Sequence, residues 1–353
     1  MLVATLWFVA LLALVAVIIG GWVERSLGRA SALQDRVTAR SEMIGAVNRV
    51  TFLTLTSYFS QRGLEILTRA DLAGASPMDV FGFTPSDASQ FIGLDDRPYR
   101  LGNVIIRLQD DHGLYKLNFA DPDTLGRLLA EYGVSYGDGA VLNDRLLDYI
   151  DKSPLMRLNG ANADSYLRAG RPLPRNNPLL TPWEAYRVLG WDDYPKLWNS
   201  PTPFPEIATV RDIGGLNPNT APAAVLRSIP GLDERAVERL LDYRASQWIL
   251  NELDLERATG VTLPVSLAQF SFFPANSLRF TLLSSHDPLA QILEIRLNPL
   301  GPLPYRIDYL IERPQTTAER AVLDRTDIPT PPLPSDMPSS EQDSGSAVSR
   351  SVE

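Results

Sequence analysis

The chain opens with MLVATLWFVALLALVAVIIGGWV (residues 1–23), a stretch that contains no charged side chain. A helix rises ~1.5 Å per residue, so this stretch would be about 34 Å long, enough to cross one bilayer core. It is also longer than the ~7–15 apolar residues of a signal peptide. We therefore predict a retained transmembrane helix rather than a cleaved signal peptide or a buried core helix.

The helical pattern continues beyond this apolar stretch. No proline occurs before Pro77, and Val37, Ile44 and Val50 recur at roughly helical spacing between polar side chains. We predict one unbroken helix that starts near the N-terminus and ends near residue 68. In this helix, residues 24–70 form an amphipathic continuation of the membrane span that reaches the soluble part of the chain.

The rest of the chain alternates between strand and helix patterns. Residues 71–98 are rich in Gly, Pro, Ser and Asp and indicate a loop, followed by two short strands on either side of a polar turn at 110–113. Residues 119–265 carry leucines at helical spacing, and strand patterns return from Phe270. The expected strands there are SLRFTLLSS (277–285), QILEIRLN (291–298) and YRIDYLIE (305–312).

This order of patterns predicts an α+β fold in which a sheet packs on the long helix. Residues 71–118 and 266–313 would supply the sheet, and residues 119–265 would form a large helical domain inserted between its strands. Residues 314–353 lose all periodicity and are rich in Pro, Ser and acidic residues. Such a segment buries too little apolar surface to offset its ordering entropy, so we predict a disordered tail.

The composition of the 353 residues excludes several classes of site. The chain contains no Cys and only two His, which rules out disulfides, Cys-ligated metals and HExxH zinc sites. Its 33 basic and 42 acidic residues give a formal net charge of -9, which disfavours general nucleic-acid binding. Asp110, Asp111 and His112 are adjacent, but a turn is normally polar. We predict that the chain is not an enzyme and binds no organic cofactor.

The sharpest local motif is LNPNTAPAAVLRSIPGLDERAVERLLDYR (216–244), which predicts a helix-hairpin-helix. Asn219 or Thr220 would cap its first helix, the Pro-Gly pair at 230–231 would end that helix, and Asp233 would cap the second. Many such hairpins bind nucleic-acid backbones, but the acidic residues at this turn would repel phosphate. We expect a structural or protein-contact role, with a membrane-tethered nucleic-acid-binding protein as the alternative.

Three stretches follow one another in a specific order. They are YKLNFADPDTLGRLL (115–129), RLLDYIDKSPLMRLNGANADSYLRAGRPLPRNNPLLTPWEAYRVLGW (145–191) and GLNPNTAPAAVLRSIPGL (215–232). In this order they resemble the type II secretion system protein K family of minor pseudopilins, and the resemblance covers about residues 1–312. It implies a pilin-like fold, with a long N-terminal helix on an antiparallel sheet and a large inserted α domain.

The resemblance also implies a location and partners. Family members lie at the tip of the periplasmic pseudopilus with minor pseudopilins I and J and the major pseudopilin, and they support protein export across the outer membrane. We expect one pass through the bacterial inner membrane and a periplasmic soluble part, although four Arg against three acids in residues 24–42 favour a cytoplasmic flank by charge alone. Family members carry a leader that prepilin peptidase removes, and Met1 would lie near the second residue of the mature chain.

The family can bind calcium in its α domain, which requires about 6–8 oxygen ligands. The matching residues here are Asp148, Asp151, Asn159, Asn162 and Asp164. This sequence departs from the family pattern, because Lys and Ser follow Asp151 and Asn162 stands where an acid is usual. We predict a calcium site formed by Asp148, Asp151, Asn159 and Asp164, and with fewer charges it would bind calcium weakly. The alternative is that these residues cap helices and turns.

Overall fold

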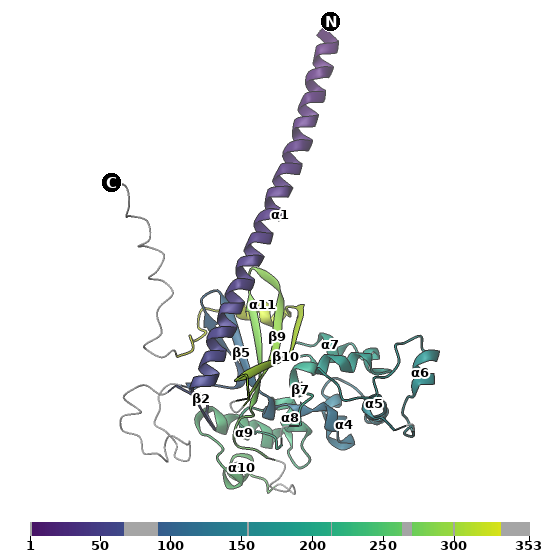
Figure 1. The fold of residues 1–353 in the computed structure, drawn as a ribbon, viewed down its shortest axis with the longest axis vertical. Helices are drawn as coiled ribbons and strands as arrows, with labels where there is room; N and C mark the ends of the chain where they lie inside the picture. The colour runs from purple at the N-terminus through teal and green to yellow at the C-terminus, as the bar shows by residue number, and fades with distance from the viewer. Residues whose placement is uncertain are drawn as a thin grey trace, which may run out of the picture.

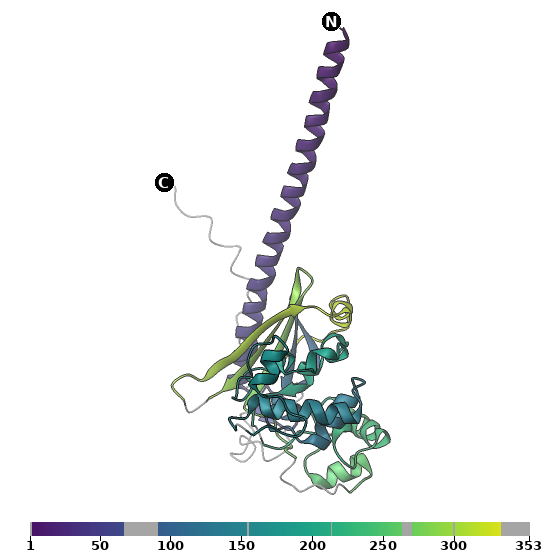
Figure 2. The same ribbon diagram turned by 90° about the vertical axis from the view of Figure 1, so that its right-hand side faces the viewer.

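A computed structural model of the chain describes residues 2–66, 91–153, 155–212, 214–262, 270–298 and 301–332. Its longest element is α1 (Leu2–Thr56), a helix of 55 residues that projects from the head of the molecule (Figures 1 and 2). The apolar stretch and the segment that reaches the head belong to this one helix. The prediction of an unbroken N-terminal helix is therefore confirmed.

The helix ends earlier than the sequence predicts, so the predicted continuation is wrong for residues 57–66, and residues 67–70 lie outside the described residues. Near its end, the hydroxyls of Thr54 and Thr56 bond back to carbonyls one turn earlier. Threonines of this kind weaken a helix. The chain then forms a small sheet. Its strands are β1 (Tyr58–Ser60), β2 (Gly63–Glu65) and β3 (Phe91–Ile92).

A five-stranded antiparallel sheet with the order β10-β9-β8-β5-β4 forms the centre of the head. Its strands are β4 (Asp95–Leu101), β5 (Val104–Asp110), β8 (Ser277–Ser284), β9 (Asp287–Leu297) and β10 (Tyr305–Pro314). The last three strands confirm the sequence prediction. The loop predicted for 71–98 is wrong at β3 and where β4 begins, and its residues 71–90 lie outside the described residues. As an edge strand, β4 tolerates Pro98 and its charged neighbours.

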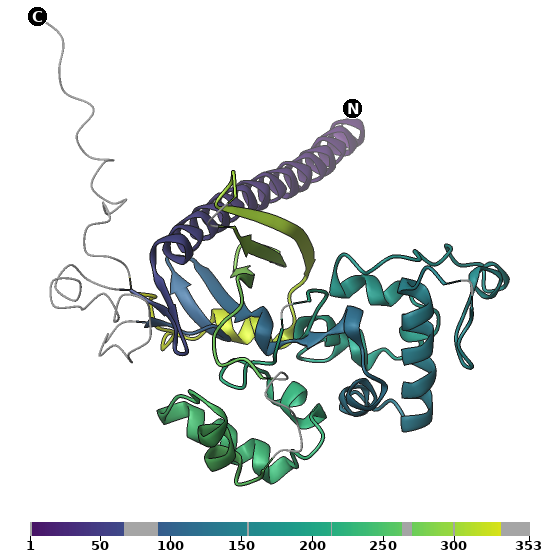
Figure 3. The same cartoon turned by 60° about the horizontal axis from the view of Figure 1, so that its bottom comes forward.

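One side of α1 packs on this sheet. The buried residues of that side are Ala39, Met43, Ala46, Val50 and Leu53. Their spacing alternates between four and three residues, which places them on one face of a helix. All of them except Ala39 share a hydrophobic core with alternate residues of β5, β8 and β9. Figure 3 shows α1 along one face of the sheet and α11 (Thr317–Leu323) on the other.

The first part of the predicted tail folds against the sheet. Residues 314–332 include α11, so the disordered tail predicted from 314 is wrong for this part, and residues 333–353 lie outside the described residues. Ile328 is buried against the face that α11 covers. The amide of Arg100 in the edge strand β4 donates to the carbonyl of Pro329 (2.9 Å). These contacts involve too few apolar residues to leave a periodic pattern in the sequence.

The helical insertion leaves and re-enters the sheet at one end, because Asp110 at the end of β5 pairs with Leu278 at the start of β8. Its α-helices are α4 (Pro122–Ala130), α5 (Tyr136–Ile150), α6 (Ala163–Arg168), α7 (Lys196–Asn199), α8 (Ala223–Ser228), α9 (Glu234–Ser246) and α10 (Glu252–Thr259). Its 3-10 helices are η1 (Asp111–Gly113), η2 (Leu117–Phe119), η3 (Pro182–Arg187), η4 (Trp191–Asp193) and η5 (Phe204–Ile207).

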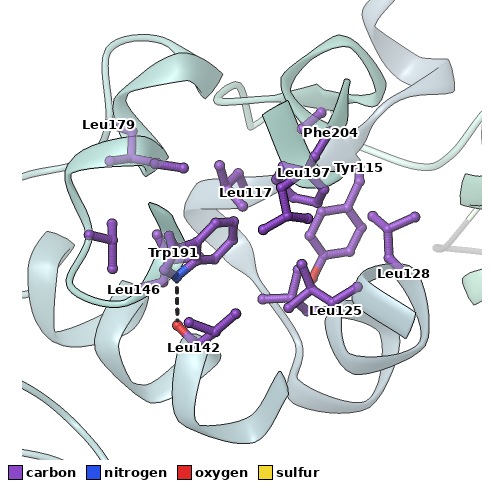
Figure 4. Packing of buried hydrophobic residues seen from close by; sticks show 14 of the residues in the cluster. Tyr115, Leu117, Leu125, Leu128, Leu142, Leu146, Leu179, Trp191, Leu197 and Phe204 are labelled. Atoms are coloured by element: carbon purple, nitrogen blue, oxygen red, sulfur yellow. Dashed lines mark hydrogen bonds between the residues drawn. The ribbon is translucent and has the colours of Figure 1, made fainter. Parts of the chain in front are cut away.

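The strands on either side of 110–113 do not pair with each other. Instead, β6 (Tyr115–Lys116) pairs in parallel with β7 (Ala208–Thr209) inside the insertion. One core of the insertion surrounds Trp191, whose indole N–H donates to the carbonyl of Leu142 (3.1 Å) (Figure 4). The polar turn predicted at 110–113 is therefore the junction between the sheet and the insertion.

Candidate functional site

The first candidate surface is the apolar part of α1. The described residues contain one helix long and apolar enough to cross a membrane, and they bury none of its most apolar stretch. The exposed side chains there include Leu6, Trp7, Leu11, Leu14, Ile18 and Trp22. A helix that is apolar on all sides requires an apolar environment. This part of α1 therefore fits a single membrane anchor.

A second apolar surface continues down α1, opposite the side that packs on the sheet. We call Leu33, Val37, Ile44 and Leu55 the outer stripe; their side chains are between 36% and 68% exposed. Val37 and Ile44 are about two helical turns apart, and Leu55 follows about three turns later, so they lie in one line. The described residues leave this line uncovered, which makes it a candidate surface for another helix.

Two arginines fix how α1 is turned on the sheet. The Nε atoms of Arg36 and Arg40 lie 3.3 and 3.1 Å from the fully buried carboxylate of Asp287, at the start of β9. Arg40 also contacts Glu312 in β10 at 2.9 Å. A buried carboxylate paired with two arginines has little freedom to move. These contacts keep the outer stripe facing away from the sheet.

The junction between sheet and insertion is built on Asp110, which is fully buried. Its carboxylate accepts hydrogen bonds from Asn217 Nδ2 (2.9 Å), Thr220 Oγ1 (2.8 Å) and the amides of Ala275 (2.7 Å) and His112 (3.0 Å). Burial raises the pKa of the Asp110 carboxyl, and the hydrogen bond from Ala275 opposes that rise. Both carboxylate oxygens accept hydrogen bonds, one from Asn217 and Thr220 and the other from the amides of Ala275 and His112. Asp110 therefore connects the end of β5 to the insertion.

The neighbouring carboxyl group, Asp111, is buried as well. Burial, followed by the nearby negative charge of Glu294, raises the pKa of Asp111 to about 8. The ring of His112 points elsewhere, with Nδ1 2.8 Å from the carbonyl of Phe273. The two carboxylates therefore lie in the protein interior, whereas the histidine ring contacts the loop at Phe273.

The helix pair α8–α9 occurs where the motif predicts it. Gly231 has φ 92° in the connecting turn, and Asp233 caps α9 by accepting a bond from the amide of Ala236 (2.7 Å). Pro222, and not Asn219 or Thr220, occupies the N-cap position of α8. The side chain of Asn219 instead bonds the main chain of Ile249, and Thr220 bonds Asp110. The two residues predicted to cap α8 thus bind distant parts of the chain instead.

Two arginines of α9 are used inside the insertion. Arg239 donates to the carbonyl of Thr259 (2.9 Å), and Arg244 donates to the carbonyls of Pro218 (3.1 Å) and Ala221 (2.7 Å). The side chain of Glu234 at the turn remains 71% exposed. A basic surface that faces outward is what phosphate binding requires, and this turn presents an acid.

The structure separates the predicted calcium residues into two groups. Asp148, Asn162 and Asp164 line one hollow of about 240 Å³. Asp151 lies outside it and accepts a bond from the amide of Ser153 (2.9 Å). Asn159 also lies outside it and bonds Asp144 through its side-chain amide (3.2 Å). The described part of the chain gathers no group of three acidic or histidine side chains that could hold a metal.

The residues of this hollow do not fit a calcium site as they are arranged. The guanidinium of Arg157 lies 2.6 Å from the carboxylate of Asp148, where a metal ion would bind. The side-chain oxygen of Asn162 caps α6 by accepting a bond from the amide of Ser165 (3.1 Å). The alternative of capping residues thus describes Asn162. Sequence reasoning did not identify Arg157, because its partner is defined by the fold of the loop.

No protein-family model matches this chain, and no curated protein matches it. Among solved structures, a chain of the GspK-GspI-GspJ complex from the type 2 secretion system of enterotoxigenic Escherichia coli aligns with a TM-score of 0.48 and 16% sequence identity. The alignment covers 82% of this chain and 100% of that chain. The function of this chain therefore has to follow from its own residues.

Proposed function

We propose that this chain is a minor pseudopilin of a type II secretion system. It would be anchored in the inner membrane by the apolar part of α1, with its head in the periplasm. It would lie at the tip of the pseudopilus, bind minor pseudopilins I and J and the major pseudopilin, and support the export of folded proteins across the outer membrane. Prepilin peptidase would be a further partner if the protein is made with a leader.

The observation that carries the proposal is that α1 has two apolar sides, only one of which packs on its own head. One side is buried on the sheet of its own head, and the outer stripe continues the apolar surface of the membrane span down to Leu55. Helices of neighbouring subunits can pack along such a stripe, first in lipid and then in water. Each aliphatic side chain that becomes fully buried there contributes about 1.5–3 kcal/mol.

The place of the insertion supports a position at the end of a filament. Figure 1 shows α4, α5, α9 and α10 at the end of the head that lies away from the N-terminus of α1. A subunit stacked beyond that end would meet this bulky region before it could reach α1. Growth would therefore stop there, while α1 remains available to subunits nearer the membrane.

Co-purification from detergent tests the proposal with the full chain and tagged minor pseudopilins I and J. We expect the wild-type chain to be retained by both partners. Leu33→Lys and Ile44→Lys should each lower retention at least ~10-fold, because burying a lysine in a helix contact costs more than about 1.4 kcal/mol. The matched control is Leu253→Lys in α10, where the leucine is 62% exposed, against 63% for Leu33.

Leu253→Lys should leave retention unchanged. If the wild-type chain is retained by neither partner, the proposed function is wrong. If all three lysine variants are retained equally well, the outer stripe is not the surface that these partners bind.

A further inference from the structure

The end of α5 carries a negative charge in an unfavourable place. Asp148 lies in the last turn of the helix, where the helix dipole disfavours an acid, and its side chain is 6% exposed. That turn contains no basic residue. A buried carboxylate of this kind requires a positive charge and hydrogen-bond donors from another segment.

The loop after α5 supplies both. Arg157 Nη1 lies 2.6 Å from Asp148 Oδ1, and the amide of Arg157 donates to Asp148 Oδ2 (3.1 Å). The second guanidinium nitrogen approaches Asp151 at 3.5 Å. One arginine thus contacts the buried carboxylate through its side chain and its main chain, and it joins that carboxylate to the end of the helix.

The backbone on the other side of the carboxylate leaves little space. A Cβ placed on Gly160 would overlap Asp148 Oδ2, so only glycine allows the loop this close to the acid. Calcium would need about 6–8 oxygens around it. The side-chain oxygen of Asn162 is engaged as the cap of α6, and the side-chain nitrogen of Asn159 is bound to Asp144, so both side chains already have partners within the chain.

We propose that Arg157 is the resident cation of the Asp148 carboxylate and that residues 155–162 fold around this pair without calcium. The positive charge that a metal would bring is supplied by the chain itself. This inference concerns the stability of the insertion and is independent of the proposed function.

Calcium dependence of the wild-type chain is the first test. The full chain in detergent is unfolded thermally in EDTA and in about 5 mM calcium, above the ~10⁻³ M dissociation constants of the weakest protein calcium sites. Terbium luminescence reports direct binding of a calcium-like ion. We expect the same Tm in both solutions and no saturable terbium signal. A calcium-dependent rise in Tm that Asp148→Asn abolishes would overturn the inference, and this result does not depend on any Arg157 variant.

The second test separates the charge of Arg157 from its packing. In EDTA, Arg157→Gln should lower the Tm by roughly 6 °C or more, because it leaves a buried carboxylate without a counter-charge. The double variant Asp148→Asn with Arg157→Gln removes both charges and should recover most of that loss. Arg257→Gln is the matched control, since that arginine also pairs with an aspartate (Asp254, 3.1 Å) but is 70% exposed. A Tm for Arg157→Gln equal to that of wild type would contradict the inference.

Discussion

The two faces of the five-stranded sheet are held by different forces. On the face under α1, Ile106, Phe280 and Leu293 are buried in one hydrophobic core. On the other face, their chain neighbours Arg107, Arg279 and Glu294 are charged. Successive side chains of a strand point to opposite faces, so the same three strands supply both surfaces. One face binds α1 mainly through apolar contact, and the other binds several segments through ion pairs beside a small apolar cluster around Ile328.

The charged face joins parts that are far apart in the sequence. Arg107 in β5 lies 3.0 Å from Glu319 in α11 and 3.6 Å from Glu206 in η5. Arg313 in β10 contacts the same two acids. Burial alone would raise the pKa of Glu319, but Arg313 and Arg107 hold it below its usual range. Apolar contact lets α1 pack tightly on the sheet, whereas the ion pairs specify where the insertion and α11 attach.

The largest expected effect is on the charged face. Arg107→Met should lower the free energy of unfolding by about 3–5 kcal/mol, because it leaves Glu206 and Glu319 buried with half of their counter-charge. Urea unfolding of the full chain in detergent, followed by circular dichroism, measures it. Arg97→Met is the control, since Arg97 is 44% exposed beside Asp95 and should cost about 0.5 kcal/mol or less. Equal losses in the two variants would show that the buried network is unimportant.

The next effect is on the apolar face. Leu53→Ala deletes a fully buried side chain of α1 near its end and should cost about 2–3 kcal/mol through lost burial and a residual cavity. Leu33→Ala, on the outer stripe of the same helix, should change stability by less than about 0.5 kcal/mol. Comparing the urea midpoints of these two variants shows whether α1 is bound by one side only. A large loss for Leu33→Ala would mean that it is not.

A smaller effect concerns pH on the charged face. The pKa of Asp111 is about 8 in the folded chain and near 4 when unfolded, so between these values only the folded state retains the proton. Stability from this group is full below about pH 4 and falls as the pH rises towards 8, at up to about 1.4 kcal/mol per unit. Asp111→Asn cannot lose a proton, so its stability should fall less than that of the wild type between pH 5 and pH 7, by up to about 2.7 kcal/mol, which Tm measurements at the two pH values report. Parallel Tm curves for the two proteins would contradict this.

The smallest effect is expected at the rim of the apolar face. Asn103 donates to Glu42 of α1 at 2.9 Å, in an exposed position. Glu42→Ala should change the free energy of unfolding by no more than about 0.5 kcal/mol, because water replaces the lost bond. A loss comparable to that of Leu53→Ala, measured in the same urea series, would mean that this exposed contact holds α1 as strongly as its apolar side does.

The same contrast explains which elements could be predicted. Strands β8, β9 and β10 and the turn at Gly231 follow local patterns, and the structure has them where those patterns lie. The edge strand β4 and the helix α11 carry weak patterns, because ion pairs and a few apolar contacts hold them. Sequence patterns therefore place both in irregular segments. The residues predicted to bind calcium show the same limit of local patterns. The sequence identifies the acids, but only the folded loop brings Arg157 to Asp148.

Local and periodic features could be predicted from the sequence alone: an apolar span that continues as one helix, the strands β8, β9 and β10, and a helix pair with Asp233 at the N-cap of its second helix. Tertiary structure alone decided where α1 ends, that Asp110 is buried, and which charges pair. Asp110 and Asn217, for example, are 107 residues apart and bond at 2.9 Å. Periodicity records which side of an element meets the protein interior. It does not record which distant residue contacts that side, because this depends on how all the elements pack together.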